Sequence, residues 1–332
     1  MSNRTSLFRN LFFVIGVGTI LFMVYKIGFQ EIYDNLQKTG WWFAAILGIW
    51  VLVYFINTIS FQLIIRDGSP ESKKISFWRT LKLVISGYAI NYTTPMGLLG
   101  GEPYRVMELK PALGVKKATS AVILYAMMHF VSHLILWILS VLLIILYVPI
   151  TQKGLTIALW CIFIVCFFLI LWAFKGYKKG MVFKLFTFLA KIPFIKKKVT
   201  KYKNENEAHL KEIDELISDL YLNRKGTFFA SLFAELVSRL VSCWEIFFML
   251  YSIGQDVTYV QCVIVVALAS LFANLLFFSP MQLGTREGGY AIAFSSLSLP
   301  GPLGVYVSLC TRIRELFWIF IGISIMKYKS LK

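Results

Sequence analysis

The chain has 332 residues, of which 58% are hydrophobic, 16% aromatic and 15% charged, and its mean hydropathy is +0.70. A soluble globular domain is nearer half apolar and a quarter charged, so this composition excludes that class and predicts an all-α polytopic membrane protein. The formal net charge of +17 fits lysines gathered in cytoplasmic loops beside anionic lipid, and we expect no nucleic-acid partner.

The apolar segments predict six full spans and two interrupted ones. The first span follows Arg4 and Arg9 and has no small-residue cleavage site directly after it, which indicates a retained signal anchor. The interrupted segments, 78–103 and 261–298, are apolar but contain proline and glycine. The six full spans are expected at about 10–28, 41–65, 118–147, 155–174, 227–253 and 303–326.

The distribution of lysine and arginine predicts how these segments run. Basic residues flank the first interrupted segment on both sides, which places both of its ends in the cytoplasm. The second must begin and end outside, because both chain termini are expected in the cytoplasm. We therefore expect re-entrant hairpins from opposite faces within one membrane domain, 1–332. Its parts are an N-terminal span (10–40), repeat one (41–147, hairpin 78–117), a span with a basic cytoplasmic loop (148–226, loop 175–226) and an inverted repeat two (227–326, hairpin 261–298).

A lysine-rich segment follows the fourth span. Ten lysines and no acidic residue lie between Lys175 and Lys203, interleaved with aromatic and aliphatic residues. The segment is either a connector that obeys the cytoplasmic charge bias or an amphipathic surface that contacts the anionic inner leaflet. Residues 205–219 then turn acidic and predict a short solvated helix.

The two interruptions share a motif. "NYTTPMGLLGGEPYRVMEL" (91–109) and "SPMQLGTREGGYAIAF" (279–294) both contain P-M-x-L-x-x-x-E. Non-helical backbone at membrane depth must be buried in protein or line a wet cavity, so each motif predicts a protein-lined cavity. The residues expected to break the helices are Pro95, Gly100, Gly101, Pro103, Pro280, Gly284 and Gly288.

The charges in these motifs suggest a binding site. A half-helix N-terminus favours an anion, and a guanidinium can bind phosphate through two hydrogen bonds, so Arg105 and Arg286 are candidate phosphate ligands. Glu102 and Glu287 either cap the half-helices and pair with these arginines, which holds the hairpins shut, or also meet a cationic headgroup. The remaining candidates are Asn91 and Asn274, which precede the breaks, and Arg312, which could face the cavity.

Other polar residues lie inside the spans. Glu235 and Arg239 are four residues apart and predict an intrahelical ion pair, while Arg314 needs a partner other than Glu315. His129 and His133 share a helix face; packing or hydrogen bonding is the expected role, and a proton relay is the alternative. We expect no metal site, because no third ligand is evident, and no cofactor. The five cysteines all lie in apolar segments and read as core residues.

The paired motifs resemble the two hallmarks of the lysylphosphatidylglycerol synthase transmembrane-region family, also described as flippase-like integral membrane proteins. The resemblance covers about 10–326. In the second hallmark, Met281 and Gln282 stand where glycines are usual, and "YAMMHFVSHLILW" stands where many members carry an arginine–aspartate pattern. The family's namesake adds a soluble aminoacyl-transferase domain, which we do not find here. The resemblance implies movement of a lipid or lipid-linked headgroup between leaflets.

We therefore expect a non-enzymatic lipid translocase, flippase-like or scramblase-like, for an anionic or zwitterionic phospholipid or a polyprenyl-linked lipid. The sequence has no G-x-x-x-x-G-K-[ST] loop, so it would act passively or through an ion or proton gradient. The alternatives are a membrane-embedded glycosyl- or lipid-modifying transferase, a small-solute or ion transporter, and a partner of another membrane enzyme. The expected location is a bacterial inner membrane, as a homo-oligomer or with a partner enzyme.

Overall fold

The computed structural model describes residues 18, 21–22, 25, 28–93, 100–148, 153–180, 182–191, 196–275 and 285–327. Within these residues the chain forms helices and turns and no strand, which confirms the all-α fold class. Most of the predicted first span, 10–28, lies outside the described residues, as do Pro95, Pro280 and Gly284.

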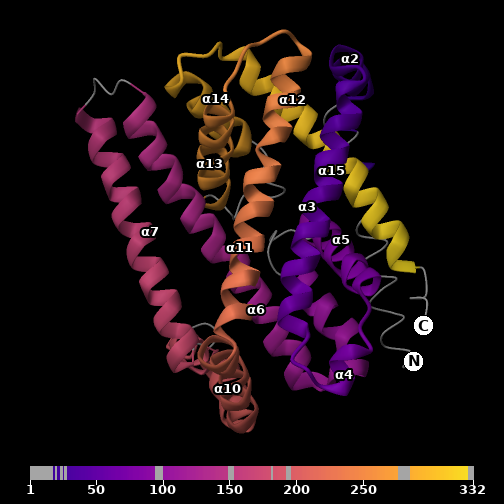
Figure 1. Cartoon of the computed structure of the whole chain (residues 1–332), viewed down its shortest axis with the longest axis vertical. Coiled ribbons are helices and arrows are strands. Elements are labelled where there is room, and N and C mark those ends of the chain that lie inside the picture. The colour runs from indigo at the N-terminus through magenta and orange to yellow at the C-terminus, as the bar shows by residue number, and fades with distance from the viewer. Residues whose placement is uncertain are drawn as a thin grey trace.

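The helices follow one another with short connections (Figure 1). The first half contains α2 (Phe29–Thr39), α3 (Trp42–Ile65), α4 (Pro70–Lys73), α5 (Phe77–Thr93) and α6 (Gly101–Tyr147). The middle contains α7 (Lys153–Lys179), α8 (Val182–Leu189), α9 (Lys196–Glu205) and α10 (Glu207–Asn223). The second half contains α11 (Lys225–Ser242), α12 (Trp244–Ser252), α13 (Tyr259–Leu275), α14 (Thr285–Ser296) and α15 (Pro302–Lys327).

Three of the described helices are long and apolar enough to cross a membrane: Trp42–Ile65, Gly101–Tyr147 and Thr156–Lys178. α15 is also long, with 26 residues, but it carries Arg312, Arg314 and Glu315 in its middle. The predicted span 227–253 is covered by two helices, α11 and α12, which are separated by the single residue Cys243, whose φ of −67° and ψ of −23° are still right-handed helical. α6 changes direction at Gly114, whose φ of 76° and ψ of 166° are not helical. The half-helix 101–113 is thereby separated from the long span that follows.

Each predicted hairpin has two described arms that pack together. α5 packs against α6, and α13 packs against α14. α4 and α10 lie at one end of the molecule, while α2 and α12 lie toward the other (Figure 1). α5 follows α4, and α13 follows α12, so the first arms of the two hairpins start from opposite ends. This arrangement accords with hairpins that enter from opposite faces; the inverted repeat and the cytoplasmic side stay predictions.

The helices of the two halves approach closely through small residues, as is common where helices pack in membranes. Ser86 on α5 donates a hydrogen bond to the backbone carbonyl of Gly322 on α15 at 3.0 Å. A Cβ at Gly322 would lie 2.6 Å from Cβ of Ala89 and 2.8 Å from the carbonyl oxygen of Ile85. α3 and α11 meet in a similar way, with the Ser60 and Ser231 hydroxyls 2.9 Å apart.

The lysine-rich segment forms short helices that are anchored on α10. Asp214 of α10 accepts hydrogen bonds from the backbone N–H groups of Val182 and Phe183, at 2.8 and 2.9 Å. It therefore satisfies free N–H groups at the start of α8, where a carboxylate is also favoured by the helix dipole. Leu185 and Phe188 on the same helix stay exposed.

We expect Gly322→Ala to lower the free energy of unfolding in detergent. The added methyl group collides with backbone of α5, and overpacking costs about 1–3 kcal/mol. Gly288→Ala is the matched control, because nothing lies within 4 Å of a Cβ there and alanine favours a helix interior. Thermal unfolding of the two purified variants measures the difference. Equal stability of Gly322→Ala and the unchanged protein would contradict this description of the α5–α15 contact.

Candidate functional site

The first motif places the start of α6 against the end of α5. Oδ1 of Asn91 accepts a hydrogen bond from the backbone N–H of Gly101 at 2.7 Å, and Nδ2 of Asn91 donates to Oε1 of Glu102 at 3.2 Å. One asparagine therefore satisfies a free N–H group of the half-helix and orients its carboxylate. Pro103 lies in the first turn, where a missing N–H is tolerated.

Arg105 lies buried between α5 and α6. Its Nη1 donates to Oε1 of Glu102 at 3.1 Å, and its Nε donates to the carbonyl of Leu83 at 3.4 Å. The guanidinium also lies 5.3 Å from the centre of the Tyr125 ring. A Cβ at Gly87 would lie 2.6 Å from Cζ of Arg105, so glycine there leaves room for the guanidinium.

The second motif docks the first turn of α14 on α15. Arg286 forms a buried ion pair with Glu315. Glu287 accepts a hydrogen bond from Oγ of Ser308 at 3.0 Å and one from Nη2 of Arg312 at 3.3 Å. Adjacent residues of this motif therefore bind different partners on α15, whereas Glu102 and Arg105 bind each other.

The middle of α15 extends this network to α12, α3 and α5. Nε of Arg314 donates to Oε1 of Glu245 at 2.9 Å, and Nη1 donates to the Tyr88 hydroxyl at 2.8 Å. The guanidinium lies 3.8 Å from the centre of the Trp50 ring, and the indole N–H of Trp50 donates to Glu245 at 2.8 Å. Every hydrogen bond in this group connects two different helices, so it fixes how they pack.

The two motifs meet at the last turn of α5. Asn91 contacts the first motif, and the next residue, Tyr92, accepts a hydrogen bond from Nη2 of Arg286 at 3.3 Å. The Tyr92 ring packs on the Tyr88 ring with their centres 4.4 Å apart, and Tyr88 reaches Arg314. Segments far apart in the sequence are therefore joined through Tyr88, Asn91 and Tyr92, which share one face of α5.

The two motif carboxylates are partly exposed, whereas the guanidiniums of the site are covered. The exposed fractions of the Glu102 and Glu287 side chains are 27% and 38%. Those of Arg105, Arg286 and Arg312 are 6%, 10% and 3%. The sequence suggested that the two motif arginines would meet a phosphate directly. In this structure the accessible groups are the motif carboxylates, Glu102 and Glu287, whereas Glu315, the partner of Arg286, is fully buried. A ligand would therefore meet carboxylates first.

The remaining predicted site residues have different surroundings. Asn274 donates to the backbone carbonyl of Ser270 on its own helix at 2.7 Å, so it does not repeat the capping contact of Asn91. Arg312 also pairs with Glu315 at 3.5 Å, as their spacing on one helix face predicts. Gly100 and Gly101 lie at the start of α6. Gly288 was predicted to break a helix, but it lies within the first turn of α14, which begins at Thr285.

Several residues of the network were not predicted to belong to the site. Glu245, Arg314 and Glu315 carried a usable signal, because charges inside apolar spans are costly and need partners. The aromatic and small residues of the network gave no such signal in the sequence, since residues of these types are common in membrane helices. They are Trp50, Tyr88, Tyr92, Gly87 and Ser308.

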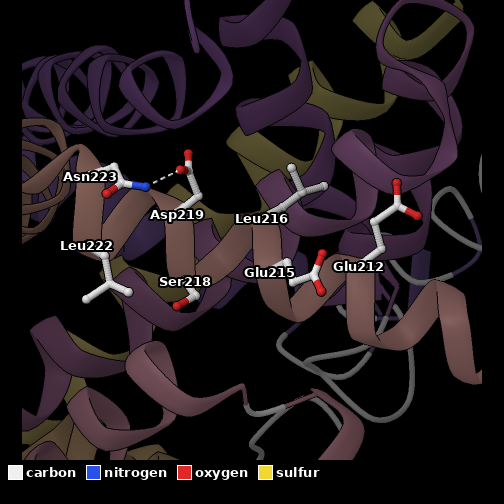
Figure 2. Close-up of a pocket in the computed structure, with 7 residues that line it drawn as sticks. All are labelled: Glu212, Glu215, Leu216, Ser218, Asp219, Leu222 and Asn223. Carbon is white, nitrogen blue, oxygen red and sulfur yellow. Dashed lines mark hydrogen bonds between the residues drawn. The ribbon is translucent and has the colours of Figure 1, made fainter.

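A separate groove lies on the acidic face of α10, away from the motifs (Figure 2). Glu212, Glu215 and Asp219 line it, and Asn223 donates a hydrogen bond to Asp219 at 2.7 Å. This face matches the solvated acidic helix that the sequence predicted. Across the described part of the chain, no three His, Cys, Asp or Glu side chains come together as a possible metal site.

The apolar helices and the buried ion pairs define an all-α integral membrane protein with a polar site that joins residues of the two sequence motifs. A family model, described as lysylphosphatidylglycerol synthase TM region, matches residues 11–322. The chain belongs to this family, which confirms the resemblance drawn from the motifs. No curated protein and no solved structure matches the chain.

We expect Glu315→Gln to destabilise the protein strongly. Its side chain is fully buried and pairs with Arg286 and Arg312, and it lies 3.9 Å from Arg314. Removing one partner of a buried ion pair leaves uncompensated charge and costs about 3–5 kcal/mol. The measurement is the free energy of unfolding in detergent. Glu212→Gln is the control, because the Lys116–Glu212 pair is exposed and contributes at most about 1 kcal/mol. Similar losses in the two variants would contradict the assigned role of Glu315.

Proposed function

We propose that the protein moves a phospholipid or lipid-linked headgroup between the leaflets of the membrane, without chemical change to the lipid. The family connects the chain with lipid handling. The observation that best supports the proposal is the pair of accessible carboxylates, Glu102 and Glu287, each bonded to a buried arginine at the junction of the motifs. Charges inside apolar helices are costly, which is why they mark substrate paths in many transporters.

The site exposes its acidic groups and buries its basic ones, and this arrangement favours a zwitterionic headgroup over a purely anionic one. An ammonium group would approach Glu102 or Glu287 first, because these are the exposed charges. Once Glu102 turns to the ammonium group, Arg105 can bind the phosphate of the same headgroup through parallel hydrogen bonds. The site would then exchange internal ion pairs for ion pairs with the lipid, at little net change in buried charge.

We expect Glu102→Gln and Glu287→Gln each to slow lipid exchange at least about tenfold, because each removes a charge-assisted contact of about 1.5–3 kcal/mol. The assay uses proteoliposomes containing phosphatidylethanolamine labelled on an acyl chain, with the outer-leaflet fraction read by chemical quenching. Glu108→Gln is the matched control, because it lies on the same half-helix beyond the first turn.

Exchange at the unchanged rate in both variants would overturn the assignment of these carboxylates. The same vesicles separate the alternatives. Solute uptake without lipid exchange would favour a secondary transporter, and transfer of a labelled group to a lipid acceptor would favour a membrane-embedded transferase.

The proposal includes contact between the lysine-rich segment and an anionic membrane surface. Leu185 and Phe188 of α8 are 50% and 63% exposed, and six of the segment's lysines lie on α8 and α9. Apolar side chains beside lysines suit the boundary between headgroups and acyl chains, where each lysine adds about 1 kcal/mol of attraction. α8 is fixed to α10 by Asp214, which would hold this surface in a set orientation.

We expect backbone amides of α8 and α9 to exchange hydrogen more slowly in nanodiscs that contain phosphatidylglycerol than in nanodiscs of phosphatidylcholine alone. High salt should remove the difference, because it screens exposed charges. Hydrogen exchange with mass spectrometry measures it, and α10, whose exposed face is acidic, is the internal control. Equal exchange of α8 and α9 in both lipids would show that the segment is a connector only.

A further inference from the structure

A second polar cluster lies between α6 and α11, apart from the motif residues. Nδ1 of His129 lies 2.7 Å from Oε2 of Glu235. Arg239 donates to Oγ of Ser132 at 2.6 Å and to the backbone carbonyl of His129 at 3.0 Å. Glu235 and Arg239 both lie in the described part of the chain, but they do not form the predicted ion pair with each other. Both side chains bind residues of α6 instead.

Glu235 is the buried member of the pair. Its exposed fraction is 0%, and its second oxygen, Oε1, has no hydrogen-bond partner among the described residues. A buried carboxylate oxygen without a partner costs free energy, since it has lost its water and gained nothing in exchange. A proton shared between Glu235 and His129 reduces that cost, because it converts a lone buried charge into a neutral pair.

His129 is the accessible member of the pair. Its side chain is 45% exposed, and its ring forms a row on one face of α6 with the rings of His133 and Trp137, each centre 5.7 Å from the next. Trp137 donates to Ser270 of α13 at 2.9 Å, so this face of α6 looks toward α11 and α13. The imidazole can therefore exchange a proton with its surroundings and pass it to the buried carboxylate.

The cluster is linked to the motif site through Tyr125. Its ring centre lies 6.1 Å from that of His129, one helical turn away, and 5.3 Å from the guanidinium of Arg105. Phe61 of α3 stacks on the tyrosine ring, with centres 4.4 Å apart. Within the described residues, the titratable and charged groups around the pair are Arg105, Glu102, Tyr125 and His133 of α6, Arg239 of α11, Cys243 at the end of α11 and Tyr92 of α5.

We propose that the His129–Glu235 pair is a proton-binding site that is loaded and unloaded as lipid is moved, so that leaflet exchange is coupled to a proton gradient. This inference rests on the proposed function. With the proton bound, imidazolium and carboxylate neutralise each other. When the proton leaves, the pair becomes more negative by one charge, which strengthens its attraction for the guanidiniums of Arg239 and Arg105 and weakens the pairing of Arg105 with Glu102. Proton release therefore frees Glu102 for a headgroup, and proton binding restores the internal ion pair.

The test measures the leaflet distribution of acyl-labelled phosphatidylethanolamine in proteoliposomes with a pH difference of one unit across the membrane. Coupling of one proton to each lipid shifts the steady-state ratio between leaflets about tenfold, whereas uncoupled exchange leaves it unchanged. His129→Gln and Glu235→Gln should both still exchange lipid but lose the shift. His133→Gln, one turn along the same face, and His209→Gln on α10 should keep it. A gradient-independent distribution in the unchanged protein, or a shift that survives His129→Gln, would overturn the proposal.

A second measurement does not depend on lipid movement. Infrared difference spectra of the reconstituted protein are recorded across the pH range in which histidine titrates. We expect carboxylate bands that change with pH. These bands should be missing in Glu235→Gln, and in His129→Gln the midpoint of their change should shift to a different pH. Spectra without a Glu235 contribution would overturn the proton site. If the unchanged protein exchanges no lipid while these bands titrate, the proposed function fails, and the coupling with it, but the proton site stands.

Discussion

The neutralisation of charge inside apolar helices is the constraint on which this structure depends. Glu315 is fully buried and lies within reach of three guanidinium groups, from Arg286, Arg312 and Arg314. Each arginine is in turn bonded to a residue of another helix. Because no member can be left unpaired in a low-dielectric interior without a large cost, the positions of α14, α12, α3 and α5 are fixed relative to α15. The charged network therefore determines the packing around the site.

Close helix contact makes this network possible, and it depends on residues that contribute no charge. α5 lies against α15 at Gly322, and Gly87 leaves space for the guanidinium of Arg105. With larger side chains at either position, the last turn of α5 would stand further from its neighbours. Asn91 and Tyr92 would then lose their contacts with the two motifs. Small residues thus place the polar residues, although only the polar residues could be assigned a role from the sequence.

The sequence predicted those features that depend on local properties. The apolar lengths predicted α3, the main part of α6, and α7. The interruptions expected at Pro95, Pro280 and Gly284 lie outside the described residues and stay predictions. The sequence could not predict which charged groups pair with each other. Glu235 has Arg239 on its own helix face and His129 on another helix, and only the packing of α6 on α11 decides between them. The division of α11 from α12 at Cys243 has no proline or glycine to mark it. Likewise, neighbouring residues Arg286 and Glu287 offered no reason to expect separate partners on α15.

The two motifs share a sequence pattern but differ in how they are held, and this difference has an energetic consequence. Glu102 and Arg105 neutralise each other within one half-helix, which ends at the non-helical Gly114. That half-helix carries its counter-charge with it, so a displacement breaks hydrogen bonds but separates no ion pair. Arg286 and Glu287 are instead paired with α15, and moving α14 alone would separate two ion pairs in apolar surroundings. Displacing the half-helix 101–113 therefore costs less than displacing α14, although both carry the same motif.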